Sequence, residues 1–451
     1  MTGRKTVPIA FIDRDGVINA YPGHFKYVTS LAEFRLLPNA AEGIKQLAAG
    51  GFRIFVVSNQ AGVAKGLYSQ QTLDEITRVM REGLAAQGAK VDAVYYCTHR
   101  SDAGCGCRKP AQGMLEQAYK VLESEGLSPD FSRSVFIGDS MIDLETGTAA
   151  GITTILVFSG RETPENSARW SVKPDATAPD LAAAARRACA TRHVPISAVV
   201  VARNEEKMIG DCLKSVHGRV DELILVDNGS TDRTVEIGKK YCDTVLEHSL
   251  AHEGLRRNWA AAQAKNDWVL MFDADERMTP ALLKEIYAAL AKDDGTVAAY
   301  WAPQRTYIGG RLLKYGGWDA PRCKLYNRRL FRWKEDPSEI VHVGIDVTPG
   351  YAGGKLTTPF EHYSFRDFEH LLAKSIQWSS LEAEKWHRQG RNMTLFHGLW
   401  RMADRFFRRY VRKQGYRDGF YGFTAAFIMG LYQFFFCIRM REIREKAKKA
   451  K

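Results

Sequence analysis

The sequence predicts an α/β protein with two doubly wound domains, each built on a parallel sheet, and a helical, basic C-terminal region. Its length of 451 residues corresponds to two to four domains at about 100 to 200 residues per domain. The composition, 45% hydrophobic and 26% charged, is typical of globular proteins and excludes collagen-like, disordered and multi-spanning membrane chains. An apolar run that ends in polar residues begins at Val7 and again at Ile196, so we expect each to open a domain.

The first domain, expected over residues 1–190, alternates strand-like and helix-like segments. The apolar runs of strand length are residues 9–13, 52–59, 93–97, 134–139 and 153–160, and two clear helical patterns cover 39–50 and 71–88. Such alternation predicts a parallel sheet with helices on both faces. Residues 175–179 and 180–190 should add a short strand and an Ala-rich helix. Residues 191–195 follow as a linker.

The second domain, expected over residues 196–390, starts the same pattern again. Its buried-strand runs are residues 196–204, 222–230 and 268–276, with helical segments between them. Each run ends in polar side chains. Because ligands of open parallel sheets bind outside the carboxyl ends of the strands, these polar side chains are the candidate site of this domain.

The excess positive charge is concentrated at the C-terminal end. Residues 401–451 carry 14 Lys and Arg against four Asp and Glu, so this segment holds +10 of the net charge of +12. A broad nucleic-acid-binding face is therefore a weaker hypothesis than a tail that meets anionic lipid, and we expect no nucleic-acid partner.

Residues 391–451 are expected to be helical and membrane-associating. The uncharged stretch 420–438 is just long enough to span a bilayer, but its glycines and the amphipathic basic stretch 400–417 favour a helical hairpin that lies in the plane of the anionic cytoplasmic leaflet. The alternative is a buried C-terminal helix with solvated basic flanks.

The eight cysteines point to a metal site rather than to disulfides. Eight in 451 residues is ordinary usage, and the N-terminal residues lack a signal-peptide pattern, so we expect a reducing cytoplasm. Cys97, His99, Cys105 and Cys107 fall within eleven residues and supply three thiolates and one imidazole. Structural zinc sites use such closed sets of four, so we expect Zn²⁺ to brace this loop without doing chemistry.

Four polar clusters in the first domain suggest metal-assisted nucleophilic chemistry. Asp13 and Asp15 follow the first strand, and alternation directs both to one side, as joint metal binding and nucleophilic attack require. The other clusters are Ser58 with Asn59, Arg108 with Lys109, and Asp139 with Asp143.

This ordered set resembles the haloacid-dehalogenase-like (HAD) phosphatases over roughly residues 7–188. The segments DRDGVIN, SNQAGVAKG, CRKPAQGM and GDSMIDLETG are similar to the branch that contains D-glycero-D-manno-heptose 1,7-bisphosphate 7-phosphatase and histidinol-phosphatase. The resemblance implies a HAD fold with Asp13 as nucleophile and Asp15 as general acid and base. It also implies that Ser58, Asn59, Arg108 and Lys109 hold the substrate, and that Asp13, Asp139 and the Asp15 carbonyl hold Mg²⁺. Two departures from this branch are a shortened zinc loop and Ser140, where lysine is frequent.

The second domain presents Asn204 and Glu205, then Asp227, then Asp273 and Asp275 at successive strand ends. Asp273 and Asp275 flank one small residue, so both can reach a divalent cation that bridges a diphosphate, and oxygen ligands suit Mg²⁺ or Mn²⁺. The set resembles family 2 glycosyltransferases of the nucleotide-diphospho-sugar (GT-A) fold, and more narrowly the lipopolysaccharide-core β-glycosyltransferases.

The second resemblance covers most of residues 196–440, through segments such as IGGRLLKYGGW, SEIVH and EHYSFRD. It implies that Asn204, Glu205, Asp227 and Asp273 bind the nucleotide sugar, and that Asp275 binds the metal with Asp273. An acidic residue would act as the base of an inverting transfer. Glu339 is favoured, with Asp336 and Glu276 as alternatives.

Together these observations predict a bifunctional enzyme of lipopolysaccharide or surface-glycan synthesis, peripheral at the inner face of the cell membrane. Its expected partners are a phosphorylated sugar, a nucleotide-sugar donor, a lipid-linked glycan acceptor and an anionic membrane surface. Three alternatives remain open: a histidinol-phosphatase-like or other small phosphomonoester phosphatase fused to a transferase of an unrelated pathway, a first domain that is a degenerate scaffold, and a nucleic-acid end phosphatase.

Overall fold

The computed structural model describes residues 5–190, 193–250, 252–335 and 343–449. The chain divides into two compact units. The first comprises the chain up to Val194 together with Gly218–Asp221 and Leu283–Lys292, and the second comprises the remainder. Each unit is described by itself below.

The first unit is a parallel α/β domain, as the alternating pattern predicts. Its described residues form a six-stranded sheet in the order β4-β3-β2-β6-β7-β8 and a small parallel pair of β1 with β5. The strands are β1 Lys5–Val7, β2 Ile9–Ile12, β3 Arg53–Asn59, β4 Ala93–Cys97, β5 Leu127–Pro129, β6 Val135–Gly138, β7 Thr153–Val157 and β8 Ala176–Ala178. The helices are η1 Leu31–Glu33, α1 Ala40–Ala49, α2 Gln70–Ala85, α3 Gly113–Ser124, α4 Met141–Ala150, η2 Pro164–Arg169 and α5 Leu181–Ala190.

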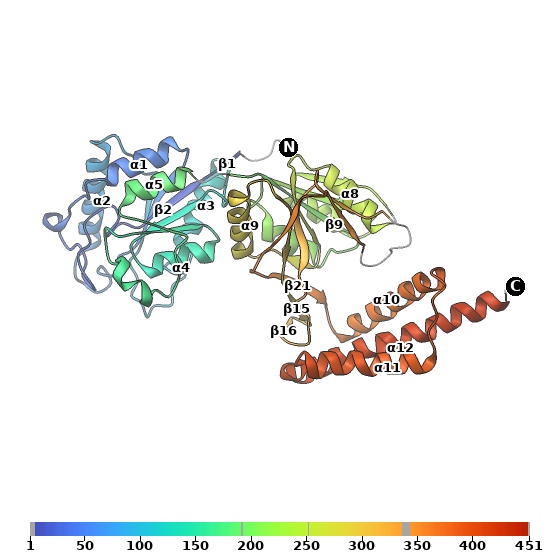
Figure 1. The fold of residues 1–451 in the computed structure, drawn as a ribbon. Coiled ribbons are helices and arrows are strands. Elements are labelled where there is room, and N and C mark those ends of the chain that lie inside the picture. Colours follow the sequence, from blue (N-terminus) through green and yellow to red (C-terminus); the bar gives the residue numbers. More distant parts are fainter. Residues whose placement is uncertain (1–4, 191–192, 251, 336–342, 450–451) are drawn as a thin grey trace. The chain divides into compact units, whose positions relative to one another are not determined.

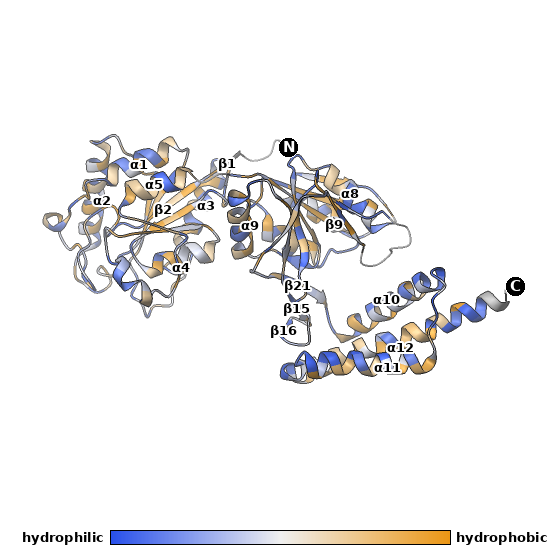
Figure 2. Ribbon diagram, viewed as in Figure 1, coloured by the Kyte–Doolittle hydropathy of each residue, from blue (hydrophilic) through white to orange (hydrophobic). Residues whose placement is uncertain are grey.

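Strand alternation in β2 divides the core of the first unit between two faces. Ala10 and Ile12 pack with α1, α2 and α5, whereas Ile9 and Phe11 pack with α3 on the other face. Figure 1 shows α1 and α5 on the side of the sheet opposite α4. Because both faces are covered, β2 reads as a continuous apolar run, and it is coloured as hydrophobic in Figure 2. The central strands are therefore buried, and polar side chains follow at their carboxyl ends.

The second unit has a mixed seven-stranded sheet in the order β11-β10-β9-β12-β17-β14-β20. Strands β9, β10, β11 and β12 are parallel, and β17 is antiparallel to both β12 and β14. A four-stranded sheet, β13-β21-β15-β16, and the pair β18 with β19 complete it. The strands are β9 Ile196–Ala202, β10 Glu222–Asp227, β11 Thr244–Glu247, β12 Trp268–Asp273, β13 Glu276–Arg277, β14 Val297–Ala302, β15 Gln304–Ile308, β16 Arg311–Leu313, β17 Arg322–Asn327, β18 Phe331–Trp333, β19 Ile345–Val347, β20 Ala352–Lys355 and β21 Phe360–Phe365. The helices of this α/β part are α6 Ile209–Val216, α7 Thr234–Tyr241 and α8 Glu253–Ala262. Helix α9 Pro280–Lys292 begins in this unit, but from Leu283 onward it is counted with the first.

The C-terminal region is helical. It consists of α10 Phe368–Arg388, α11 Leu395–Phe407, the π-helical turn η3 Arg408–Arg412, η4 Gly415–Asp418 and α12 Gly419–Lys449. Small residues let these helices approach closely: a side chain at Gly422 would collide with the carbonyl of Gly415, and one at Gly398 would collide with Cys437. Helix α10 lies inside the range 196–390 expected for the second domain, yet it packs along α12. The helical region therefore begins at Phe368.

Candidate active sites

The first site lies at the carboxyl ends of β2 and β6. Asp13 directly follows β2, Asp139 directly follows β6, and both side chains are buried. Carboxylate oxygens of Asp13, Asp139 and Asp143 all lie within 4.8 Å of one another. The approach is so close that a side chain at Gly16, which has φ +84°, or at Gly160 would collide with the Asp139 carboxylate. Glycine at these two positions is therefore required by the site.

Lys109 is the buried cation of this cluster. Its Nζ donates to Asp13 Oδ1 at 2.8 Å, to Asp143 Oδ1 at 2.6 Å and to the Val57 carbonyl at 2.9 Å. Asp143 also accepts the Ser140 hydroxyl at 2.6 Å, at the start of α4. Asp143 and Asp13 thus both hold the Lys109 ammonium in the site.

Asp15 lies in a network of its own. Arg14, which is fully buried, donates to both Asp15 carboxylate oxygens at 3.0 and 3.1 Å. Asn19 donates at 2.9 Å and Gln60 at 2.8 Å. The Asp15 side chain is 16% exposed. Four hydrogen-bond donor atoms therefore hold the Asp15 carboxylate in place, and part of the side chain still contacts solvent.

The charges of the first site suit a divalent cation. Three carboxylates share the single ammonium of Lys109. Burial raises the pKa of Asp13 to about 6, against the opposing effect of Lys109. Burial likewise raises the pKa of Asp139 well above its ordinary value, with Asp13 and Asp143 adding to the effect. Negative charge at this spot is costly without a counter-ion, and oxygen ligands are what Mg²⁺ takes. The donor set fits Mg²⁺.

The four predicted zinc ligands converge at the end of β4. The Cys97 and Cys107 sulfurs each lie 3.6 Å from Cys105 Sγ, and His99 Nδ1 lies 3.7 Å from Cys97 Sγ and 3.2 Å from Cys107 Sγ. Tetrahedral zinc with Zn–S of about 2.3 Å and Zn–N of about 2.0 Å places its ligand atoms roughly 3.5 to 3.8 Å apart. Three of these four separations fall in that range and the fourth, from His99 to Cys107, is shorter, so the four atoms are close enough to share one zinc ion.

The second site is a cavity of about 1340 Å³ in the second unit. Glu205 after β9, Asp273 at the end of β12 and Asp275 beyond it line one part of it, and residues of α10, α11, η3 and α12 line another. A cavity of this size exceeds the usual range for small-ligand sites, so it has room for more than one ligand.

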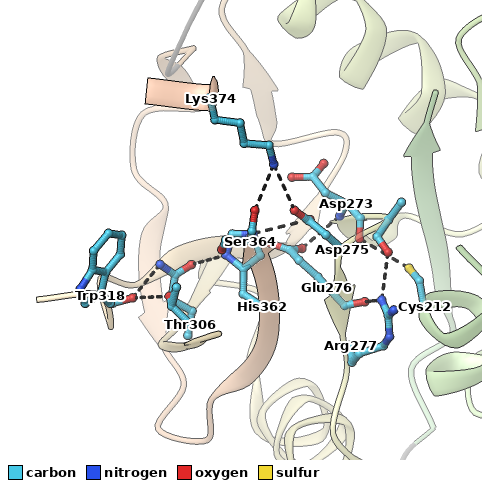
Figure 3. Close-up of polar contacts among 12 residues, drawn as sticks. Cys212, Asp273, Asp275, Glu276, Arg277, Thr306, Trp318, His362, Ser364 and Lys374 are labelled. Atoms are coloured by element: carbon cyan, nitrogen blue, oxygen red, sulfur yellow. Dashed lines mark hydrogen bonds and ion pairs between the residues drawn. The ribbon is translucent and has the colours of Figure 1, made fainter. Parts of the chain in front are cut away.

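Asp275 lies beside His362 and Lys374. His362 Nε2 lies 3.5 Å and Lys374 Nζ 3.8 Å from its carboxylate, as Figure 3 shows. Although burial opposes ionisation, these neighbours lower the pKa of Asp275 well below its ordinary value. His362 is oriented in turn by Gln304, whose amide donates to the Trp318 carbonyl. Asp275 is therefore ionised and rigidly placed.

Asp273 is bound by Arg257, whose guanidinium donates to it at 3.0 Å and to Glu253 at 2.8 Å. Its backbone N–H donates to Glu276 at 3.0 Å. Burial works against ionisation of Asp273, but Arg257 keeps its pKa below the ordinary value. Two ionised carboxylates then flank Ala274 at the edge of the cavity, a donor set that suits Mg²⁺ or Mn²⁺.

The chain matches two family models, one described as HAD-hydrolase-like over residues 106–184 and one as glycosyl transferase family 2 over residues 197–343. Over 184 residues it is 38% identical to the D-glycero-D-manno-heptose-1,7-bisphosphate 7-phosphatase of Chlorobaculum tepidum, which covers 39% of this chain and 92% of that relative. Through its first domain the chain belongs to this phosphatase family. Its second domain is a family 2 glycosyltransferase domain.

Solved structures are similar to each domain. A D,D-heptose 1,7-bisphosphate phosphatase from B. bronchiseptica, complexed with magnesium and phosphate, is 31% identical and covers 40% of this chain and 97% of its own, with a TM-score of 0.36. The mannosyltransferase PcManGT from Pyrobaculum calidifontis, in complex with GDP-Man and Mn²⁺, is 13% identical and covers 55% and 88%, with a TM-score of 0.33.

In the phosphatase domain, the structure brings most of the predicted residues together. Ser58 is buried, with Gln60 donating to its hydroxyl at 3.2 Å. Asn59 instead exchanges hydrogen bonds with the backbone of Lys109, so it positions that lysine. Arg108 donates to the His99 carbonyl at 3.4 Å, which links the predicted substrate arginine to the zinc loop.

In the transferase domain, Glu205, Asp273 and Asp275 line the cavity, whereas Asn204 and Asp227 lie outside its lining. Asp227 is buried, and its carboxylate accepts hydrogen bonds from Gly229 and Ser230 of its own loop. The favoured base, Glu339, and its alternative Asp336 lie outside the described residues. The second alternative, Glu276, is buried in an ion pair with Lys324 at 2.5 Å.

Several polar residues of these sites had no role assigned from sequence. They are Arg14, Gln60 and Asp143 in the phosphatase domain, and Arg257, Lys324, His362 and Lys374 in the transferase domain. Asp143 lies inside the segment GDSMIDLETG and His362 inside EHYSFRD, both recognised from the sequence. Their polar side chains within these segments could therefore have marked them as site residues. Lys374 lies on α10, and no local pattern connects it to Asp275.

Proposed function

We propose that the chain is a bifunctional enzyme of lipopolysaccharide-core synthesis. Its phosphatase domain removes a phosphate from D-glycero-D-manno-heptose 1,7-bisphosphate, and its transferase domain moves a sugar from a nucleotide donor to a lipid-linked glycan. The observation that carries the first half is the buried Asp13, Asp139 and Lys109 cluster in a domain 38% identical to a heptose-bisphosphate phosphatase.

In the proposed phosphatase reaction, a carboxylate oxygen of Asp13 attacks phosphorus while the bond from phosphorus to the sugar oxygen breaks. Asp15 gives its proton to that leaving oxygen, and later takes a proton from the water that hydrolyses the aspartyl-phosphate. Lys109 and Ser58 hold the phosphoryl oxygens. Mg²⁺, bound by Asp13, Asp139 and the Asp15 carbonyl, would neutralise charge between two anionic reactants.

The substrate proposal is tested by measuring phosphate release from the heptose bisphosphate and from histidinol phosphate side by side, with Mg²⁺ present. We expect a preference of at least 100-fold in kcat/KM for the heptose ester, which corresponds to about 2.7 kcal/mol of transition-state discrimination. A preference for histidinol phosphate would contradict the proposed substrate. The phosphatase and transferase domains would then have no pathway in common.

In the proposed transfer, Asp273 and Asp275 would hold a divalent cation, whose charge would stabilise the departing nucleoside diphosphate, while Glu205 contributes to the nucleoside pocket. The carboxylates are ionised and lie on the strand-end edge of the cavity, which supports this role. An acidic side chain would accept the acceptor's hydroxyl proton as the oxygen bonds to the donor's anomeric carbon with inversion.

We further propose that Cys97, His99, Cys105 and Cys107 bind one structural zinc ion. Purified protein is expected to contain one equivalent, and Cys105→Ser is expected to lose it, together with several degrees of thermal stability and part of the phosphatase activity, because the loop carries Arg108 and Lys109. Cys189→Ser, at an exposed cysteine, is the matched control. Full zinc content in the Cys105 variant would contradict the proposal.

The C-terminal helices are proposed to bind the anionic inner face of the cell membrane in the plane of the interface. Exposed apolar side chains gather on α11, η3 and α12, with Phe396 80% and Phe420 72% exposed. Arg412, Lys413 and Arg417 are exposed in the same region. Apolar side chains rimmed by cations are the signature of an interfacial helix.

Helix α12 also meets the criterion for a spanning helix. The segment Gly415–Lys446 is long enough to cross a membrane, and its most apolar 18-residue window has a mean hydropathy of 1.5, but 44% of that window is buried within the protein. Figure 2 shows the hydrophobic colour in the middle of α12 and hydrophilic residues near its C-terminal end. The burial of this helix against α10 and α11 favours the in-plane arrangement.

Cosedimentation with vesicles tests the membrane proposal. We expect binding to vesicles with anionic lipid and weaker binding to neutral ones. Phe396→Ser with Phe420→Ser should weaken binding about 100-fold, because each buried aromatic is worth about 1.5 kcal/mol or more. Phe25→Ser is the control, since Phe25 is 85% exposed in the phosphatase domain. If the Phe396 and Phe420 double variant bound vesicles as tightly as the Phe25 variant, these side chains would not form the membrane-binding surface.

A further inference from the structure

The transferase cavity has a second, cationic wall that the helical region supplies. Lys385 and Arg391 from α10 and the loop after it, Arg405 from α11 and Arg409 from η3 all line the cavity. Glu382 is the acidic residue of the helical region in that lining. Its carboxylate accepts the hydroxyl hydrogen of Tyr432, which also lines the cavity.

The arginines of this wall are not paired with carboxylates among the described residues. Arg409 lies over the Trp318 ring, 4.2 Å from its centroid, and donates to the Gly316 carbonyl at 3.0 Å. Arg391 lies 5.1 Å from the centroid of Trp386. Aromatic faces hold a guanidinium in place without neutralising it, so the positive charge stays available to a ligand.

Arg405 gives the strongest evidence that this wall binds an anion. Its Nε is buried and has no hydrogen-bond partner within the described part of the chain. Burial lowers the pKa of Arg405, and the neighbouring Arg408 adds to the effect. Burial also lowers the pKa of Arg409 to about 10, with Arg405 and Arg408 contributing. Clustered, desolvated cations destabilise one another unless an anion binds between them.

The position of this wall separates it from the donor half of the site. Its residues come after position 380, outside the residues 197–343 that match the family 2 model. The arginine beside the donor carboxylates, Arg257, is already engaged by Asp273 and Glu253. Arg405 and Arg409 are four residues apart and so share one helical face, whereas the exposed Phe396, Trp400 and Phe407 lie on a different face of α11.

We propose that this wall is an acceptor subsite for an acidic saccharide, with Arg405 and Arg409 binding a phosphate or carboxylate group of the acceptor. A guanidinium fork matches both anions and forms charge-assisted hydrogen bonds to them. This proposal rests on the glycosyltransferase function proposed above and adds the chemical class of its acceptor. The anionic group would orient the saccharide so that its reactive hydroxyl faces the donor.

The proposal is tested with the full chain and three forms of one acceptor: lipooligosaccharide that is intact, dephosphorylated or carboxyl-reduced. We expect transfer to the intact acceptor and a rise of at least tenfold in acceptor KM for the form that lacks the recognised anion. A higher KM for the dephosphorylated form would identify phosphate as the ligand, and a higher KM for the carboxyl-reduced form would identify carboxylate. Equal KM for all three forms would overturn the subsite proposal and leave the transferase function standing, whereas no transfer to any form would count against both.

Variants locate the subsite. Arg405→Gln and Arg409→Gln should each raise the KM for the intact acceptor at least tenfold, with the KM for the donor unchanged, and Arg409→Lys should restore part of the loss. Arg388→Gln is the matched control, because Arg388 is exposed, pairs with Glu384 and lies outside the cavity lining. An unchanged acceptor KM in both glutamine variants would overturn the assignment.

A binding measurement keeps the test independent of turnover. Mannose 6-phosphate and mannose serve as probes, and tryptophan fluorescence reports binding near Trp318. We expect the phosphate to strengthen binding at least tenfold in the wild-type chain and in Arg388→Gln, but not in Arg405→Gln. Because Arg405 Nε forms no hydrogen bond within the described part of the chain, Arg405→Gln should melt no lower than the wild type. Phosphate-dependent binding that survives in Arg405→Gln would contradict the proposal.

Discussion

Replacing Asp13 by Asn is expected to abolish phosphate release while leaving glycosyl transfer unchanged. Asp13 is the proposed nucleophile, and an amide oxygen neither attacks phosphorus nor holds a cation as a carboxylate does. The loss should reach about 10⁴-fold or more in kcat, the scale seen when a covalent nucleophile is removed. Phosphate release from the heptose bisphosphate measures it, and Asp74→Asn, at an exposed side chain of α2, is the control.

Stability separates loss of chemistry from loss of fold in the Asp13 variant. Because the folded-state pKa of Asp13, about 6, lies above the ordinary 3.8, its contribution to the free energy of unfolding falls as pH rises from 4 to 6. In Mg²⁺-free protein at pH 7, Asp13→Asn should therefore melt no lower than the wild type, and its advantage should shrink toward pH 4. An inactive variant that melts well below the wild type would instead indicate a damaged fold.

Asp275→Asn is expected to reduce glycosyl transfer about 10³-fold and leave phosphate release intact. Its carboxylate is kept ionised by His362 and Lys374, and it lies with Asp273 at the cavity edge. Removing it weakens the hold on the cation that stabilises the leaving diphosphate, a contribution of several kcal/mol, and about 1.36 kcal/mol corresponds to a tenfold change in rate.

The transfer rate measured against Mn²⁺ concentration tests the role of Asp275. Excess Mn²⁺ should restore part of the lost rate if the carboxylate binds the cation. Asp211→Asn on α6 is the control, because Asp211 is 80% exposed and contacts Arg277 only at 3.9 Å. A normal rate in Asp275→Asn would show that the metal, if used, is held elsewhere.

The strand-end residues of both sites could be found from the sequence because parallel strands deliver their carboxyl ends to one edge. Asp13 and Asp139 belong to the neighbouring strands β2 and β6 and lie together in the structure for that reason. The proposed zinc ligands could be found for another reason, since eleven consecutive residues contain all four.

The remaining groups depend on long-range packing that leaves no local pattern. Lys109 and Asp143 are 34 residues apart, yet their buried ion pair forms only once the loop before α3 meets the start of α4. The pairing of Glu276 with His362 across β13 and β21 is what brings His362 beside Asp275. The helical region was expected from the sequence, but not that α10 and α11 would line the transferase cavity.

By itself, then, the sequence determined two α/β domains, the strand-end carboxylates and a close cluster of Cys and His, because periodicity, strand order and short spacing are local properties of a chain. The families followed from the resemblance of short motifs, which are also local. Tertiary structure decided the surroundings of each charge: Lys109 lies between Asp13 and Asp143, Asp275 lies beside His362 and Lys374, and Arg405 Nε has no hydrogen-bond partner in the described part of the chain. The physical reason is that burial and pairing set the energy of a charge, and both depend on residues distant in sequence.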